Sequence, residues 1–229
     1  MNKTLKRVVA IAVVGSALLI AGPWVYINLI KDDAPMAFDL KVKTDSSDSQ
    51  NILNIDGDWS IAADSNSVVG YRVKEILFGQ ETEGVGRTKS VSGDLVIADN
   101  SVTSASFSVD MTTLMSDAAK RDAQFNGRIM DVASYPTATF TLTQPISLPS
   151  NATSGEVITA EATGELTLRG TTKTVIFPIE AQLSGATFTV VGSIKIVFDE
   201  WGIPDPGLPG ISVDPDGLLE FSLQFSRNK

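Results

Sequence analysis

The dominant pattern beyond about residue 55 is an alternation of apolar and polar positions. It recurs in stretches 69–73, 91–97, 105–111, 175–181, 188–198 and 219–225. A period of two is typical of β-strands that bury one face. Turn-forming residues separate the stretches, at Asp99-Asn100, Ser184-Gly185 and Pro215-Asp216-Gly217. The sequence therefore predicts an all-β domain of antiparallel strands.

One stretch departs from this alternation. In Ser116 to Phe125, the sequence SDAAKRDAQF offers Ser116 as a helix N-cap, followed by helix-favouring Ala and Lys, and Gly127 as a terminator. We predict one short helix near residues 116–126, between strands and close to one end of the domain.

Strands with a single apolar face and almost no helix form either a closed barrel or a sandwich. A barrel of about eight strands has room for one elongated ligand. A packed core would produce the same apolar stripes, so the alternation alone leaves both the architecture and the state of the interior open.

The N-terminal segment has the pattern of a membrane anchor. Lys3, Lys6 and Arg7 precede an uncharged run from Val8 to Ile30, which is long enough to span a bilayer about 30 Å thick. The positive charges ahead of the run predict a cytoplasmic N-terminus and a domain on the other side. A cleaved signal peptide is the alternative, for which Ala21-Gly22 is a poor cleavage site; the domain would then be secreted.

Residues 31–54 separate this run from the β-rich part. Thr44 to Gln50 (TDSSDSQ) is polar and has no apolar period, which is typical of a flexible linker. We therefore divide the chain into a cytoplasmic tip and transmembrane anchor at 1–30, a stalk at 31–54 and a β-domain at 55–229.

Composition removes several kinds of chemistry. The chain has no cysteine and no histidine, which excludes disulfides, Ser-His-Asp catalysis and His-ligated zinc within this chain. All 27 acids and 15 of the 18 Lys/Arg lie after residue 30, so that part carries a net charge of −12. Such a surface repels nucleic acid, which is not an expected partner.

Three motifs, in order and at matching spacing, resemble the YceI-like family. They are VGYRVKE (Val69–Glu75) with SVSGDL (Ser90–Leu95), RDAQFNGRIMDVASYPTATF (Arg121–Phe140) and TGELTLRGTTKTVIFPI (Thr163–Ile179). The resemblance covers roughly residues 55–227. It implies an antiparallel lipocalin-like β-barrel, secreted or periplasmic, of a type in which some members bind a polyisoprenoid chain such as a quinone tail. The family often carries histidine where this chain has Glu75, Gln124 and Arg169.

The inward positions of the stripes are the candidate ligand-binding residues. They are Tyr71, Val73, Phe107, Val109, Met111, Phe140, Phe177, Ile179, Phe188, Val190, Phe221 and Leu223. An isoprenoid tail offers no hydrogen bonds, so binding would rest on the burial of apolar area.

Three other motifs have structural interpretations. Arg121-Asp122 is expected to fix the short helix by an ion pair, with contact to a ligand head group as the lesser alternative. Pro136 holds Tyr135 extended and so predicts the start of a strand. Pro204 to Gly217 (PDPGLPGISVDPDG) lacks the spacing of a calcium loop and is interpreted as a turn-rich rim.

The sequence thus predicts extracytoplasmic binding, transport or sensing of a long-chain isoprenoid lipid. We expect no catalytic residues, no metal and no cofactor apart from a bound isoprenoid lipid or quinone. The expected partners are this lipid and the membrane that holds the N-terminal helix. The alternative function is a non-catalytic structural module of the cell envelope with a dry core. An extracytoplasmic hydrolase is a distant third interpretation, since among 27 acids no spacing singles out a carboxylate pair.

Overall fold

The computed structural model describes residues 25, 34–40, 55–62, 64–149, 152, 155–208 and 210–228. Its strands are β1 (Gly57–Ile61), β2 (Val68–Leu77), β3 (Gln80–Thr88), β4 (Val91–Ala98), β5 (Ser101–Asp110), β6 (Met115–Ser116), β7 (Thr137–Leu142), β8 (Ile146–Ser147), β9 (Ile158–Leu168), β10 (Thr171–Ser184), β11 (Thr187–Val197), β12 (Ile211–Val213) and β13 (Asp216–Arg227). Helix α2 (Ala119–Gln124) continues into a π-helical turn, η3 (Phe125–Ile129), and two 3₁₀ turns are η2 (Met111–Thr113) and η4 (Phe198–Trp201).

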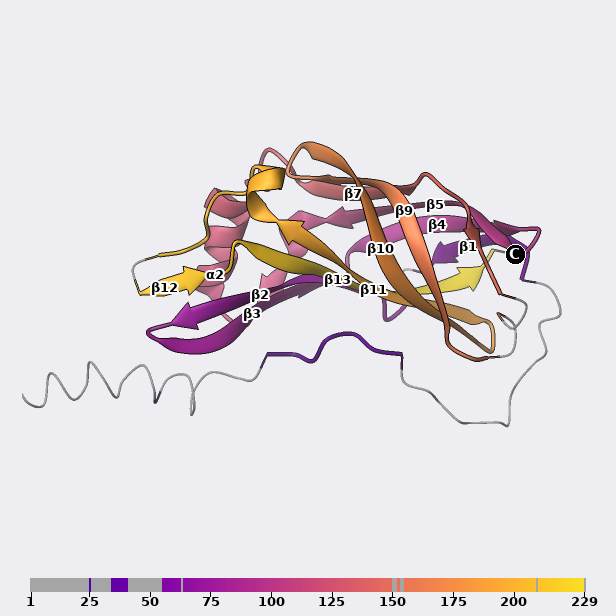
Figure 1. Ribbon diagram of the computed structural model, residues 1–229, viewed down its shortest axis with the longest axis horizontal. Coiled ribbons are helices and arrows are strands. Elements are labelled where there is room, and N and C mark those ends of the chain that lie inside the picture. Colours follow the sequence, from indigo (N-terminus) through magenta and orange to yellow (C-terminus); the bar gives the residue numbers. More distant parts are fainter. Residues whose placement is uncertain are drawn as a thin grey trace, which may run out of the picture.

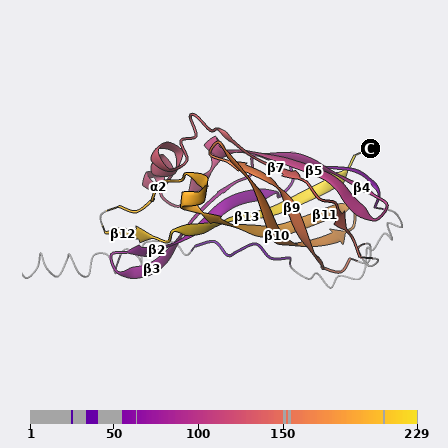
Figure 2. The same ribbon diagram turned by 45° about the horizontal axis from the view of Figure 1, so that its top comes forward.

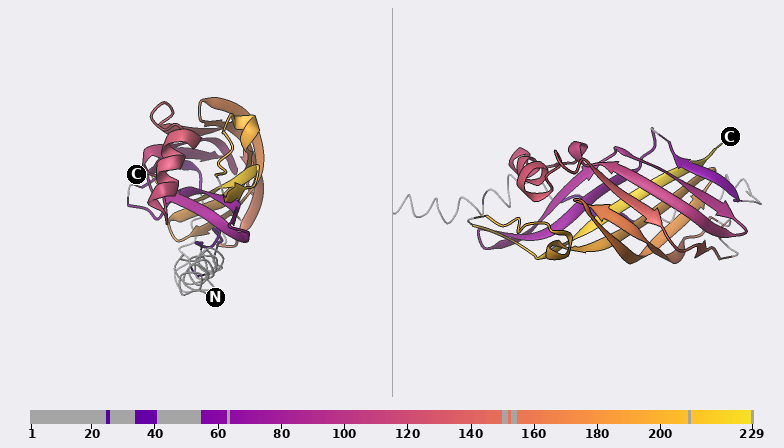
Figure 3. Two further views of the ribbon diagram at one scale, coloured as in Figure 1. Left: turned by 90° about the vertical axis from the view of Figure 1, so that its left-hand side faces the viewer. Right: turned by 90° about the horizontal axis from the view of Figure 1, so that it is seen from above.

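Eight of these strands close into an antiparallel barrel, in the order β1-β4-β5-β7-β9-β10-β11-β13. The ring is sealed where β1 pairs with β13, from Trp59 opposite Arg227 to Ile61 opposite Phe225. The ring is seen end-on in the left view of Figure 3. Of the two architectures that the alternation left open, the structure is the barrel.

Strand β13 has two different neighbours along one edge. Its residues 225–227 pair with β1, whereas Leu218–Ser222 pair with β2. The hairpin of β2 and β3 therefore extends beyond the closed ring, and β12 is added to the far end of β2. Figures 1 and 2 show this hairpin, β12 and α2 gathered at one end of the molecule, opposite the C-terminal end of β13.

The turns explain why the strands reverse where they do. Asp99 and Asn100, between β4 and β5, both have positive φ (49° and 58°), as a two-residue hairpin turn that matches the twist of its strands requires. Asp and Asn are among the few non-glycine residues that tolerate this conformation. The turn predicted at Ser184-Gly185 lies between β10 and β11.

The short helix is present, but its predicted bounds and cap are wrong. It begins at Ala119, and its N-cap residue Ala118 makes no side-chain cap hydrogen bond. Ser116 lies in β6 instead, and its hydroxyl bonds Asp122 Oδ1 at 2.6 Å. Gly127 does not end the helix, because the π-helical turn carries it on to Ile129.

Large side chains are fully buried at the closed end of the barrel. Trp59 and Phe225 each expose only 1% of their surface, and the Trp59 indole donates to the Ile55 carbonyl at 3.0 Å. The Trp59 ring also contacts that of Phe188, with centroids 6.1 Å apart. This end of the interior is therefore filled by large side chains.

The predicted membrane span at 8–30 lies outside the described residues apart from Val25. Among the residues that the structure describes, no helix is long and apolar enough to cross a membrane. Most of the predicted stalk also lies outside them. Within it, Ala34 to Leu40 is described, and this segment lies against the outer face of the barrel.

Candidate functional site: an apolar cavity in the barrel

The barrel encloses a cavity of about 600 Å³, lined almost entirely by hydrocarbon. A packed protein interior has few voids larger than a water molecule, whereas binding sites for small molecules measure roughly 300–1,000 Å³. The interior of this barrel is therefore hollow in part. Its size and lining suit an apolar ligand rather than a polar one.

All twelve residues that the sequence singled out line this cavity. They are Tyr71, Val73, Phe107, Val109, Met111, Phe140, Phe177, Ile179, Phe188, Val190, Phe221 and Leu223. They come together because alternate residues of a strand point to the same side, and ring closure turns that side inward on every strand. Their placement is thus as expected, while their contact with a ligand stays a prediction.

A chain of phenylalanine rings crosses the cavity wall. Phe107 stacks on Phe140 (centroids 6.2 Å apart), and Phe177 meets Phe140 and Phe221 edge to face at 5.5 and 5.9 Å. Offset and edge-to-face pairs are the favourable arrangements of such rings. The rings hold one another in fixed orientations, which gives the apolar wall a defined shape.

Glycine on the neighbouring strand makes room for one of these rings. A Cβ atom on Gly164 of β9 would lie only 2.3 Å from the Phe140 ring. The residue pairs with Leu142 of β7 and Val175 of β10, so the close approach occurs within the ladder itself. Gly164, the glycine of the GELTL motif, is therefore needed because the Phe140 ring leaves no room for a side chain there.

The cavity reaches the surface at the end where α2 and β12 lie. Lining residues at this end include exposed Ala119 and Lys120 on α2, and Leu208 and Leu218, each 36% exposed. At the opposite end the lining residues Phe188 and Phe225 are 2% and 1% exposed. We call the end marked by Ala119, Lys120, Leu208 and Leu218 the mouth.

A small polar network lies just inside the mouth. Arg121 of α2 pairs with Glu75 of β2 at 3.0 Å and with Asp117 one turn earlier. Glu75 is 8% exposed and Arg121 half-buried, so the pair is largely withdrawn from water. Burial lowers the pKa of Arg121, but the carboxylates of Glu75 and Asp117 raise it more, so its pKa is raised overall and the guanidinium stays charged.

Tyr71 joins this network to the apolar wall. Its ring stacks on Phe125 of η3, with centroids 4.8 Å apart, and burial raises the pKa of its phenol above the ordinary value. The phenol is therefore neutral at physiological pH. A ligand head group at the mouth would therefore meet hydrogen-bonding side chains that are already paired with one another.

The Arg121-Asp122 motif has two separate roles. Arg121 does not pair with its neighbour but with Asp117 and Glu75, and it lines the cavity. Asp122 accepts hydrogen bonds from the Ser116 amide (2.8 Å) and hydroxyl (2.6 Å), which ties β6 to the helix. Of the positions where the family often has histidine, Glu75 and Gln124 line the cavity and Arg169 does not.

Sequence reasoning missed the lining that comes from outside the regular strands. This part includes Leu114, Phe125, Ile129, Met130, Phe198, Ile203, Pro206 and Leu208. These residues lie in turns, the helical segment and the loop before β12, where no period of two marks the inward side. The apolar residues of the 204–217 rim were the available signal, since Leu208, Ile211 and Val213 alternate with turn residues.

The other motifs have structural roles. Pro136 ends the connection to β7, which begins at Thr137, and its carbonyl accepts from the Met111 amide at 2.9 Å. Within the described residues, no group of three or more Asp, Glu, His or Cys is placed to hold a metal ion.

Solved structures share this fold. A polyisoprenoid binding domain from Saccharophagus degradans, implicated in plant cell wall breakdown, is 16% identical, with a TM-score of 0.59 over 74% of this chain and 98% of that one. Burkholderia cenocepacia BcnA is 22% identical, with a TM-score of 0.57 over 72% and 98%. The Campylobacter jejuni YCEI protein is 15% identical, with a TM-score of 0.53 over 63% and 85%.

At these identities the likeness concerns the fold alone. No curated protein matches the sequence significantly. The sequence model of the YceI-like domain, however, matches residues 59–225, which span the barrel from β1 to the seam in β13. The chain therefore belongs to the YceI-like family.

Proposed function

We propose that the barrel binds the polyisoprenoid tail of a lipid in its cavity and carries or presents that lipid outside the cytoplasm. The observation that supports this most directly is the cavity itself, with an apolar wall, one filled end and one mouth at the surface. Each 100 Å² of hydrocarbon removed from water contributes about 2.5 kcal/mol, so an uncharged hydrocarbon tail can be held without any ionic contact.

The solved relative from Saccharophagus degradans is described as a polyisoprenoid binding domain, and it has the same fold. This supports the same class of ligand here. We propose that the ligand is bound and released unchanged; in support, the buried carboxylate among the lining residues, Glu75, is paired with Arg121. We propose a carrier or sensor rather than a catalyst.

We further propose that residues 8–30 anchor the protein in the membrane with the barrel on the outer side. The basis is the uncharged run behind Lys3, Lys6 and Arg7. Protease added to spheroplasts should degrade the barrel, and washing with high salt should leave the protein in the membrane. Protection of the barrel, or its release by salt, would contradict this placement.

The ligand is tested with the full chain purified in mild detergent. Lipids extracted from it are identified by mass spectrometry, alongside Phe177→Ala and Val190→Ala, which alter the wall. We expect a co-purifying isoprenoid in the wild type and much less in both variants. For Phe177→Ala we expect less than the roughly 3–5 kcal/mol that truncating a fully packed Phe costs.

The opposite pattern would favour the structural-module alternative. In that case the wild type would contain no lipid and would not bind added polyprenol. Phe177→Ala would lower the free energy of unfolding by the full amount of about 3–5 kcal/mol. The exposed β11 variant Lys195→Ala serves as the control, since its side chain is 63% exposed and does not line the cavity.

A further inference from the structure

The turn between β2 and β3 presents an apolar surface at the mouth. Phe78 is 58% exposed and Ile76 45%, and Leu208 of the adjoining loop is 36% exposed. The Phe78 amide bonds the Gly210 carbonyl at 2.9 Å, which fixes the turn against that loop. We call Ile76, Leu77, Phe78, Leu208 and Ile211 the tip. Leu77, Leu208 and Ile211 also line the cavity, so the tip is continuous with the apolar interior.

Phe78 is an unfavourable residue for folding at its position. Its φ is +51°, in the left-handed region that glycine and asparagine adopt readily and bulky side chains rarely do. More than half of its side chain lies in water, so little burial offsets this strain. An aromatic residue at a strained, exposed turn points to a use in binding.

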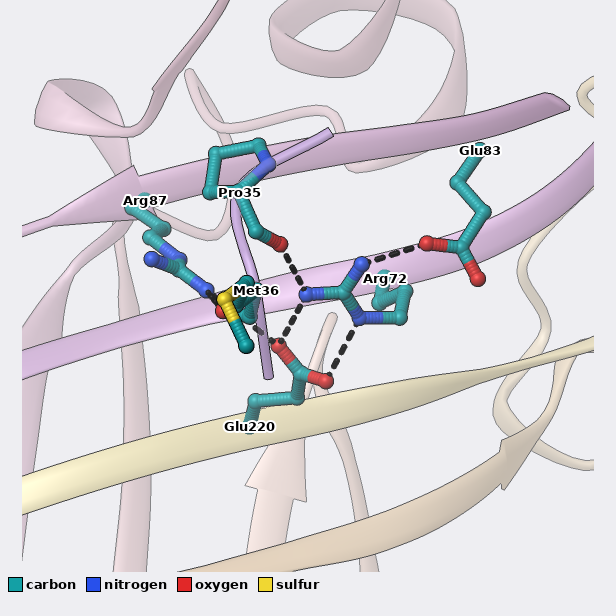
Figure 4. Close-up of polar contacts among 6 residues, drawn as sticks. All are labelled: Pro35, Met36, Arg72, Glu83, Arg87 and Glu220. Carbon is teal, nitrogen blue, oxygen red and sulfur yellow. Dashed lines mark hydrogen bonds and ion pairs between the residues drawn. The ribbon is translucent and has the colours of Figure 1, made fainter. Parts of the chain in front are cut away.

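The segment Ala34–Leu40, which we call the strap, is held against the outer face of the barrel through two of its carbonyls. Figure 4 shows the strap over β2 and β3, where Arg72 donates to the Pro35 carbonyl at 2.6 Å and Arg87 donates to the Met36 carbonyl. Arg87 also lies 4.2 Å from the Phe38 ring centre, and Leu40 is buried.

The order of these contacts gives the direction of the strap. Pro35 is held by Arg72, and Met36 by Arg87, which lies opposite Gly70. From Pro35 to Met36 the chain thus moves away from Leu77, the end of β2. Ala34, where the strap begins, therefore lies on the side of the tip.

The lengths on the two sides of Arg72 match. From Arg72 to Leu77 the strand rises about 17 Å, at ~3.3 Å per residue. The apolar run ends at Ile30, which is also five residues from Pro35. These five residues span at most about 17 Å when fully extended. Whatever path these residues take, a membrane surface at Ile30 lies within about 17 Å of Pro35, which is also about the distance from Arg72 to the tip.

We propose that the tip rests in the surface of the membrane that holds the chain's own N-terminal run, so that the mouth of the cavity opens onto the lipid. The inference rests on the proposed function, because it takes residues 8–30 as an anchor. The charged groups around the tip include Lys74, Lys120, Arg128, Glu81, Glu83, Asp205 and Asp214, which are close to neutral in sum. Contact therefore depends on the apolar side chains and suits a zwitterionic surface, and a tail can pass from bilayer to cavity without crossing water.

The absence of cysteine makes a direct test simple. The full chain carrying Phe78→Cys is reconstituted in phosphatidylcholine vesicles and labelled with a nitroxide. We expect the label to be accessible to oxygen dissolved in the lipid and shielded from a water-soluble nickel complex. Ala186→Cys, in the exposed turn between β10 and β11 at the closed end, is the matched control and should show the reverse. Equal exposure of both labels to nickel would overturn the proposal.

Phe78→Asn separates membrane contact from folding and from ligand affinity. Asparagine suits the left-handed turn, so we expect an unchanged or higher melting temperature and unchanged binding of a polyprenol in detergent. We expect transfer of a fluorescent polyprenol from vesicles to the barrel to fall roughly tenfold or more, as loss of one buried aromatic side chain implies. Unchanged transfer would contradict the proposal. Failure of the proposed function would be seen differently, as no polyprenol binding by the wild type in detergent.

Discussion

Arg72 and Glu220 lie on the outer face of their strands, yet they are 9% and 4% exposed. Two hydrogen bonds join them, at 2.7 and 3.3 Å, and Glu83 and the Pro35 carbonyl accept from further guanidinium donors. The alternation along β2 predicts only that Arg72 faces away from the cavity. Its burial depends on the strap, more than thirty residues earlier in the chain, so no local pattern could reveal it.

Removing one partner of this pair should be costly. In Arg72→Met the buried Glu220 carboxylate keeps, among the residues that the structure describes, only the more distant Arg87 as an ionic partner, at 3.8 Å. We expect a loss of roughly 3 kcal/mol in the free energy of unfolding. The double variant Arg72→Met/Glu220→Leu should recover much of this loss, because the buried carboxylate is removed with its partner, and Glu83 and Arg87 are more exposed than Glu220. Urea unfolding followed by tryptophan fluorescence measures both.

The pair Lys195–Asp216 is a control of similar geometry at the surface. Its atoms are 3.0 Å apart, but the side chains are 63% and 37% exposed. Lys195→Met should therefore cost less than about 1 kcal/mol. If Arg72→Met lowered the free energy of unfolding no more than Lys195→Met does, the strap would not bury the Arg72–Glu220 pair in solution.

Gly164 supports a second prediction. In Gly164→Ala the new methyl group meets the Phe140 ring and the Thr141 carbonyl, so the ring or the ladder must shift, at a cost of about 1–3 kcal/mol. Gly127→Ala is the matched control, since nothing lies within 4 Å of its Cβ position. Thermal unfolding of the two variants should differ by several degrees; equal melting temperatures would mean that the Phe140 ring moves freely.

Among the secondary-structure elements, the helical segment was the hardest to predict in detail. The composition of residues 116–125 indicates a helix, but Ser116, the predicted cap, lies in β6 and bonds Asp122 from there. The alternation predicted β2, β4, β5, β10, β11 and β13, because each of them buries one face and burial of one face leaves a period of two. It did not mark β1, β3 or β9. The π-helical turn after Gln124 leaves no such signal.

Asp122 should therefore control the order of α2. Its carboxylate accepts two hydrogen bonds from Ser116, and hydrogen bonds to charged groups contribute about 1.5–3 kcal/mol each at most. Asp122→Ala should raise amide hydrogen exchange in residues 116–124 while β9 and β10 stay protected. Uniformly faster exchange would instead mean that the helix and the barrel unfold together.

For the whole molecule, the alternation and the family-like motifs were enough to infer the barrel and its interior face. They also gave the twelve lining residues, because closure of the ring makes one face of every strand point inward. The mouth could not, since it is formed by the helix, the loop before β12 and the end of the β2–β3 hairpin. These segments meet because the two ends of β13 have different partners on the same edge: its last residues pair with β1, and Leu218–Ser222 pair with β2. The N-terminal anchor stays a prediction.

Binding of an isoprenoid should be insensitive to salt. The cavity wall is hydrocarbon, so although the part of the chain beyond residue 30 carries −12, screening that charge changes no contact with an uncharged tail. We expect a polyprenol at about 100 times its Kd to stabilise the barrel by about 2.7 kcal/mol, in about 0.1 M and about 1 M NaCl alike. Loss of the effect at high salt would point to an ionic head-group contact at Arg121.

The seam between β1 and β13 also has a consequence for the order of events during synthesis. Trp59 pairs with Arg227, so the ring joins residues that leave the ribosome at nearly opposite ends of translation of the domain. Hairpins such as β4–β5 and β9–β10 can form as soon as they emerge, but closure must wait for the last residues of β13. Contacts so distant in sequence slow folding, and until they form the apolar interior is exposed. A nascent barrel is thus an open sheet, and its interior is enclosed only when its final strand is complete.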